Sequence, residues 1–133
     1  MKKRLLIVFG VFLALFLIFG ISIYMQIKQN TNHILSQSIE EVDFSEYEDG
    51  IYQGEYYSKD IGVLVLVEIE NGKVISIAYD NHLNGKGEEA ETINQEILDK
   101  QSIMVDDVSG ATTSSRCIKL AIMNAFKEGN NNE

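Results

Sequence analysis

The sequence predicts an α+β protein: a small antiparallel sheet built around a central β-hairpin, with two helices, preceded by one transmembrane helix and a stalk. Three observations lead to this prediction. The N-terminal part is a long apolar segment, two strand-like runs flank an Asn-Gly pair, and two segments with helical spacing of apolar residues follow. About 80 residues remain for the folded domain, which is close to the lower limit for a single stable core.

The apolar segment, Leu5 to Met25, runs for 21 residues without a charge. At about 1.5 Å rise per residue, this length spans a hydrocarbon core about 30 Å thick. A cleaved signal peptide has a shorter apolar core and then small residues at its cleavage site; no such site follows here, so an uncleaved anchor is the favoured interpretation. Basic residues precede the segment, and the positive-inside rule places them in the cytoplasm and everything after Tyr24 outside. We therefore predict a single-pass protein of the cell membrane, with residues 1–25 as cytoplasmic N-terminus and anchor and an extracytoplasmic C-terminal domain.

The charges of the rest of the chain exclude several classes of function. All 20 acids lie at or beyond Glu40, and after the three N-terminal basic residues only 8 Lys and Arg oppose them, a net charge of −12. This balance argues against binding to nucleic acid or to anionic lipid headgroups. The lone Cys117 excludes an internal disulfide and cysteine-based metal sites, and His33 and His82 are too few and too far apart for a histidine cluster. We therefore expect no metal site.

The exported part is expected to begin with a polar stalk, residues 26–48, before a domain that starts near Asp49. The opening DGIYQGEYY carries a turn signal and predicts one strand. GVLVLVEIE (62–70) is β-branched and apolar almost throughout, which predicts a strand buried on both faces. The Asn-Gly pair at 71–72 is the strongest short signal for a hairpin turn, and KVISIAYD (73–80) alternates like the returning strand.

Two helices are predicted in the second half of the domain. A glycine-punctuated loop, NHLNGKG (81–87), leads to EEAETINQEILDK (88–100), whose apolar residues recur at three and four positions after an acidic first turn. SSRCIKLAIMNAFKEG (114–129) has an apolar face and ends on lysine and glycine signals. The domain is therefore expected over 49–129, followed by NNNE (130–133) as a frayed tail.

The connection between these helices contains the stretch VDDVSGATTSS (105–115). Its last seven residues are all small, and five of them carry a hydroxyl. Gly110 permits positive φ or close backbone approach, and Ser114 or Ser115 is a suitable N-cap for the following helix. A helix N-terminus with flanking hydroxyls is also a site for an anion such as phosphate. From residue types alone the plain helix cap is the favoured interpretation, because such caps are common.

The order of the residues in this stretch is more informative than their types. DDVSGATTSS resembles the flavin-attachment motif of the FMN-binding domain family, which includes covalent-flavin subunits of sodium-pumping quinone reductases and Rnf-type electron-transport complexes, and small membrane-anchored extracytoplasmic flavoproteins. The family's pattern is Asp, two residues, Ser or Thr, then Gly-Ala-Thr, often followed by one residue and Thr-Ser. DGIYQG, NGKVISI and HLNGKGEEA resemble other segments of its domain, so the resemblance covers roughly Asp49 to Lys127. Ser114 stands where the family often has threonine, and it keeps the hydroxyl.

The resemblance implies a covalent cofactor. In the family a flavin transferase moves FMN from FAD onto the hydroxyl of the threonine after alanine, here Thr112, and forms a phosphoester bond. Thr113 is chemically equal but occupies the variable position, and Asp106 matches the motif aspartate, with a role in recognition or in activation of the hydroxyl. The cofactor-binding residues that the resemblance implies are Asp106, Ser109, Gly110, Ala111, Thr112, Thr113 and Ser114.

The function that this resemblance implies is that of a membrane-anchored extracytoplasmic electron carrier rather than an enzyme with its own substrate. Electrons would arrive from a membrane redox partner, a quinone or a dehydrogenase, and leave to an external acceptor. Two alternatives stay open. One is a module that binds FMN reversibly as a sensor or scaffold, and the other is an anchored interaction domain without flavin.

Aromatic residues are candidates for contact with the isoalloxazine ring, which needs apolar and aromatic surface. The tyrosines concerned are Tyr52, Tyr56, Tyr57 and Tyr79. Each is more often a strand residue that completes a small core, and His82 is expected to be a solvated loop residue because turn residues surround it.

Overall fold

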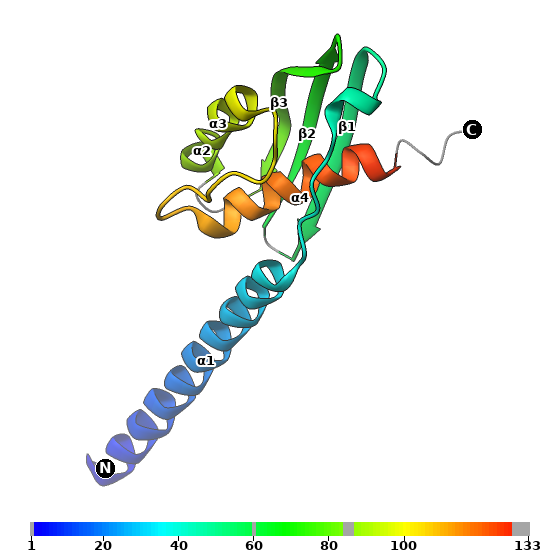
Figure 1. Ribbon diagram of the computed structural model, residues 1–133. Coiled ribbons are helices and arrows are strands. Elements are labelled where there is room, and N and C mark those ends of the chain that lie inside the picture. Colours follow the sequence, from blue (N-terminus) through cyan, green and yellow to red (C-terminus); the bar gives the residue numbers. More distant parts are fainter. Residues whose placement is uncertain (1, 60, 84–86, 129–133) are drawn as a thin grey trace. The chain divides into compact units, whose positions relative to one another are not determined.

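A computed structural model describes residues 2–59, 61–83 and 87–128 (Figure 1). The chain forms two units, Met1–His33 and Ile34–Glu133. The second unit contains a three-stranded antiparallel sheet and the helices that follow it, so the predicted α+β class is confirmed. The tail predicted at 130–133 lies outside the described residues.

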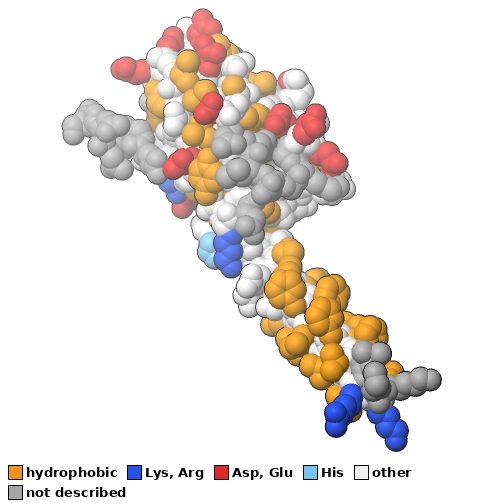
Figure 2. All heavy atoms as spheres, turned by 180° about the vertical axis from the view of Figure 1, so that it is seen from behind, with side chains coloured by type: hydrophobic (Ala, Val, Ile, Leu, Met, Phe, Trp, Pro, Cys, Tyr) orange, Lys and Arg blue, Asp and Glu red, His pale blue; other side chains and the backbone are white. Residues whose placement is uncertain are grey.

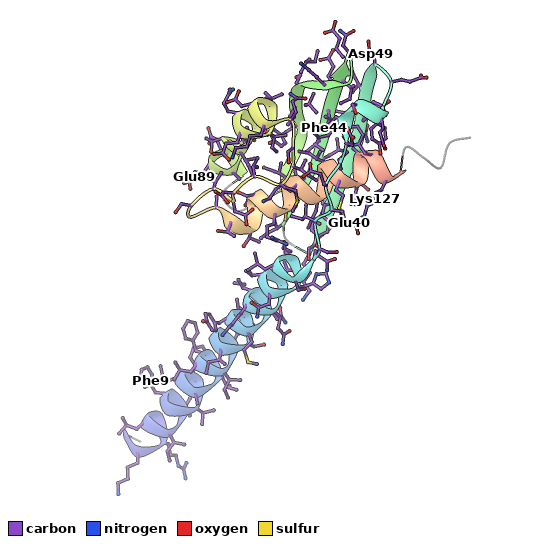
Figure 3. All side chains as sticks on the ribbon, viewed as in Figure 1. Phe9, Glu40, Phe44, Asp49, Glu89 and Lys127 are labelled. Atoms are coloured by element: carbon purple, nitrogen blue, oxygen red, sulfur yellow. The ribbon has the colours of Figure 1, made fainter. Side chains whose placement is uncertain are left out.

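The first unit is formed by α1 (Lys2–Ser36), which continues into the first residues of the second unit. Its most apolar window has a mean hydropathy of 2.9, and none of the residues in that window is buried. Side chains such as Phe9 are exposed (Figure 3). Figure 2 shows hydrophobic side chains along this helix and Lys and Arg side chains at its N-terminal end. Among the described residues this is one helix long and apolar enough to cross a membrane. It extends beyond the predicted anchor, through the first part of the predicted stalk.

The sheet consists of β1 (Gly50–Ser58), β2 (Ile61–Glu70) and β3 (Lys73–Leu83), hydrogen-bonded in the order β1-β2-β3. The predicted hairpin is confirmed, with β2 and β3 antiparallel. Asn71 and Gly72 have φ values of 52° and 71°, the left-handed conformation that a type I′ turn requires at both central positions.

Burial of β2 on both faces is not found, which corrects the prediction. Val63, Val65 and Val67 are fully buried, whereas Glu68 and Glu70 are exposed. The sheet is covered by helix on one face, so β2 alternates between a core side and a solvent side. A run of apolar residues identifies the strand but does not reveal how many layers cover it.

The glycine-punctuated loop predicted at 81–87 is shorter than expected. Its first residues continue β3 as far as Leu83, which pairs with Gly62 of β2. Residues 84–86 lie outside the described part of the chain. Position 82 is therefore in a strand rather than a loop, which corrects the expectation for His82.

Three helices follow the sheet: α2 (Gly87–Ala90), α3 (Ile93–Lys100) and α4 (Thr112–Glu128). The single helix predicted at 88–100 is thus divided, with a turn at 91–92 between α2 and α3. α4 begins at Thr112, two residues before the predicted start. In Figure 1 it lies across one face of the sheet, and it contacts β1 and β2, while α3 contacts β3.

The contact between α4 and β1 depends on Gly54. A Cβ atom on this residue would lie 2.2 Å from the carbonyl oxygen of Ala121 and 2.4 Å from the backbone nitrogen of Ala125. No side chain fits between these backbones, so glycine allows the helix to rest directly on the strand. This close approach sets the position of α4, and with it the position of the motif at its N-terminus.

The second part of the predicted stalk packs on the domain. Phe44, within a short 3-10 helix η1 (Phe44–Glu46), is 3% exposed and makes an edge contact with Phe126 of α4, with ring centroids 5.3 Å apart. Figure 3 shows Phe44 with Glu40 and Lys127, whose Oε2 and Nζ atoms form an ion pair at 2.7 Å. Residues just before the predicted boundary at Asp49 therefore contribute to the core, although the boundary itself stays a prediction.

Candidate functional site

The predicted motif forms a tight turn that leads directly into α4. The N–H of Ala111 donates to the carbonyl of Val108 at 2.9 Å, and Gly110 has a φ of 82°. This is the left-handed region, where a side chain would be strained, so glycine at this position serves the turn. Thr112 is the first residue of α4 and its side chain is exposed. The turn thus presents a threonine hydroxyl at the start of a helix.

The predicted site residues lie together in this turn but differ in exposure. Asp106, Ser109, Gly110 and Thr112 are exposed, Thr113 is half-buried, and Ala111 and Ser114 are buried. The exposed residues of the predicted set that carry a hydroxyl are therefore Ser109 and Thr112. Buried Ala111 is packed into the domain and holds the turn in place.

The predicted N-caps, Ser114 and Ser115, lie inside the helix, which corrects the prediction. Because α4 begins at Thr112, both fall in its first turn and are buried. The Ser115 hydroxyl accepts a hydrogen bond from the N–H of Val108 and donates one to the carbonyl of Ala111, each at 3.0 Å. It therefore fastens the turn to the helix from the core side.

A residue that sequence reasoning missed also holds the turn. Lys119 is 5% exposed, and its Nζ lies 2.6 Å from Oδ1 of Asp107 and donates to the carbonyl of Val105 at 2.8 Å. The contact with Asp107 lacks regular hydrogen-bond angles, so it is a close ion pair. A lysine within the apolar run of the predicted helix was the available signal. Its partner is Asp107, whereas the motif aspartate Asp106 is exposed.

Replacing Lys119 with methionine is expected to destabilise the domain by about 2–3 kcal/mol. Removing one partner of a fully buried ion pair costs about 3–5 kcal/mol, because the remaining charge is left without compensation. Here the remaining charge is that of Asp107, which is 20% exposed, so contact with water lowers this cost. Chemical denaturation followed by circular dichroism measures the change. Lys100→Met is the control, because the Lys100–Glu96 pair is exposed and contributes at most about 0.5 kcal/mol. Equal losses in both variants would contradict a special role for Lys119.

A cavity of about 250 Å³, lined by both polar and apolar side chains, lies beside the first turns of α4. The described residues that line it are Gln37, Ser38, Ile39, Met104, Val105, Arg116 and Lys119. A larger hollow of about 420 Å³ lies on α1, and the described residues that line it are all apolar side chains of that helix. The smaller cavity, by contrast, is lined in part by two cationic side chains, Arg116 and Lys119.

Two of the candidate tyrosines are engaged in holding the fold. The Tyr79 hydroxyl donates to Oδ1 of Asn94 at 2.5 Å, and burial raises the pKa of Tyr79 well above its ordinary value. The Tyr52 hydroxyl donates to the carbonyl of Glu48, and its ring contacts Phe126 near the C-terminal end of α4. Tyr52 therefore lies at the end of the helix opposite to the motif.

Tyr56 lies nearer to the motif. It pairs with Val63, and burial, together with the neighbouring Cys117, raises the pKa of Tyr56. Along β1 it follows Tyr52, which contacts Phe126, and Gly54, which lies against Ala121, so it lies toward the N-terminal half of α4. Tyr57 is exposed on the other side of β1. His82 of β3 pairs with Val63 of β2, which pairs on its other side with Tyr56 of β1; the side chain of His82 is outside the described part.

Comparison with known proteins identifies one family. A family model described as an FMN-binding domain matches residues 57–127, a range that includes β2, β3, the helices as far as Lys127, and the whole motif. No curated protein and no solved structure matches the chain.

Proposed function

Because the chain belongs to the FMN-binding domain family, we propose that it carries FMN as a phosphoester on Thr112 and acts as a membrane-anchored, extracytoplasmic electron carrier. The exposure of Thr112, in the motif that the family uses for attachment, is the observation that carries this proposal.

The turn fits a phosphate group. Thr112 is exposed at the first position of a 17-residue helix, where free backbone N–H groups and the helix dipole favour negative charge. Gly110 and Ala111 place no bulky side chain next to the hydroxyl. Thr113, half-buried and one position further on, is the less accessible of the two threonines.

Attachment is a phosphoryl-type transfer in which Thr112 is the nucleophile. Its Oγ1 forms a bond to the phosphorus on the riboflavin side of FAD, the pyrophosphate bond breaks, and AMP leaves. The hydroxyl proton must pass to a base, and exposed Asp106, in the same turn, is our candidate for orienting or accepting it. A flavin transferase supplies the remaining machinery for this step.

Once attached, FMN supplies one- and two-electron redox chemistry, and the chain supplies position and electrostatics. The turn holds the phosphate, and Tyr56 is our candidate for contact with the ring because it lies toward the motif. α1 anchors the carrier near a membrane electron donor, a quinone or a dehydrogenase. A covalent link keeps the flavin from diffusing away outside the cell.

The experiment that tests this proposal is mass spectrometry of the full chain exported from a host with a flavin transferase. Cleavage after Lys100 and Arg116 releases residues 101–116, which contain the whole motif. The expected result is a gain equal to FMN minus water on this peptide, located at Thr112 by fragmentation, with flavin fluorescence in a denaturing gel. An unmodified peptide would reject covalent attachment. Dialysis against FMN would then distinguish a reversible FMN module from a domain without flavin.

A further inference from the structure

The cavity beside the motif has an uneven charge. Two cationic side chains, Arg116 and Lys119, line it, and the described lining residues include no carboxylate. Lys119 is already neutralised by its ion pair with Asp107. The cation to explain is therefore Arg116.

The donors of Arg116 are only partly used. Its Nη2 donates to the carbonyl of Gln37 at 2.6 Å, while its Nε is buried without a hydrogen-bond partner. None of the ion pairs found in the described part of the chain involves Arg116. A half-buried guanidinium with spare donors favours an anion, and its planar fork matches phosphate oxygens.

Arg116 is also placed to reach the attachment point. It follows Thr112 by four positions on α4, and residues with this spacing are neighbours on one side of a helix. Side chains on a helix lean toward its N-terminus, and a phosphate on Thr112 would use the guanidinium donors that the hydrogen bond to Gln37 leaves unused.

We propose that Arg116 binds the phosphate that joins the flavin to Thr112. This inference rests on the proposed function. It assigns to Arg116, which lies outside the attachment motif, the selection of FMN over riboflavin by means of the phosphate. The side chain acts as a recognition residue: it compensates the phosphate charge and positions it over the hydroxyl. Lys119, by contrast, shapes the turn through Asp107 and Val105.

Two measurements on the full chain test this inference. The first compares the binding of FMN and of riboflavin to protein made without a flavin transferase, by quenching of flavin fluorescence. We expect wild type to prefer FMN by about tenfold or more, equivalent to about 1.4 kcal/mol, and Arg116→Gln to lose that preference. Arg116→Lys, which keeps the charge, is expected to retain part of it.

The second measurement is the rate of covalent attachment with limiting transferase. We expect Arg116→Gln to be about tenfold slower, Arg116→Lys intermediate, and Lys127→Gln unchanged. Lys127 is a matched control because it lies on the same helix, at its far end, paired with Glu40. Thermal unfolding checks that each variant is folded. If Arg116→Gln does not fold, Arg116→Lys is used for the test instead.

The outcomes separate the inference from the proposed function. Normal attachment in Arg116→Gln together with an unchanged FMN preference would overturn the role of Arg116 and leave Thr112 attachment intact. A loss of FMN preference in protein whose Thr112 is never modified would support the phosphate site and reject covalent attachment. If wild type binds neither flavin and Arg116→Gln is modified at the wild-type rate, the inference is also rejected.

Discussion

Replacing Thr112 with alanine is expected to abolish covalent flavin attachment completely while leaving the domain folded. The proposed phosphoester needs a hydroxyl, and Thr112, which is exposed at the start of α4, carries one. Because the residue is exposed at the first helical position, its substitution should change the free energy of unfolding by no more than about 0.5 kcal/mol. In-gel flavin fluorescence and the mass of peptide 101–116 measure the loss directly.

Two variants make this prediction specific. Thr113→Ala is expected to keep attachment, since that half-buried residue is not the proposed acceptor. Thr112→Ser keeps a hydroxyl and is expected to be modified, at a reduced rate. If fluorescence persisted in Thr112→Ala and disappeared in Thr113→Ala, the acceptor would be Thr113 and our assignment would be wrong.

Substitution of Gly54 by valine is expected to have the largest effect on stability, a loss of about 3 kcal/mol or more. A Cβ at this position would lie 2.2 Å from the carbonyl of Ala121 and 2.4 Å from the nitrogen of Ala125, both backbone atoms. Neither atom can move without shifting α4, so the clash is removed only if the helix is displaced from β1. We therefore expect a larger cost than the 1–3 kcal/mol, roughly, that is typical of overpacking. In a domain of this size, such a loss is a large part of the total stability.

Denaturant unfolding of the unmodified protein measures this loss, and Gly50→Ala is the matched control. Gly50 begins the same strand, and a Cβ there meets nothing within 4 Å, so its variant should lie within about 0.5 kcal/mol of wild type. Flavin attachment should fall in Gly54→Val as well, because displacement of α4 moves Thr112. Superimposable unfolding curves for the two glycine variants would show that the helix does not rest on Gly54.

Local signals were sufficient for much of the fold. Hydropathy alone identified an N-terminal helix long enough to cross a membrane, and the Asn-Gly pair identified the hairpin whose turn has positive φ at both residues. The order of residues around Thr112 also indicated the family. These properties depend on neighbours a few positions apart, which is why a single sequence reveals them.

Helix limits and capping were less well predicted. Ser114 and Ser115 are good capping residues by type, yet α4 begins at Thr112 and both face the interior. The reason is that the turn at Gly110 lets the chain enter the helix earlier, and Ser115 then bonds the turn from within. Residue types describe what a side chain is able to do, while the backbone path decides which partner it meets.

What the sequence alone determined, then, is the anchor-like helix, the hairpin, the three strands that precede the helices of the domain, and the motif that contains Thr112. Only the tertiary structure decided that Lys119 holds the turn through Asp107, that Arg116 bonds Gln37 beside a cavity, and that Phe44 enters the core. The Arg116 and Phe44 contacts join residues about 80 positions apart, and such pairs leave no periodic or local pattern in the chain. They form because α4 rests on β1 at Gly54. In this position, α4 contacts both the segment before β1 and the motif turn.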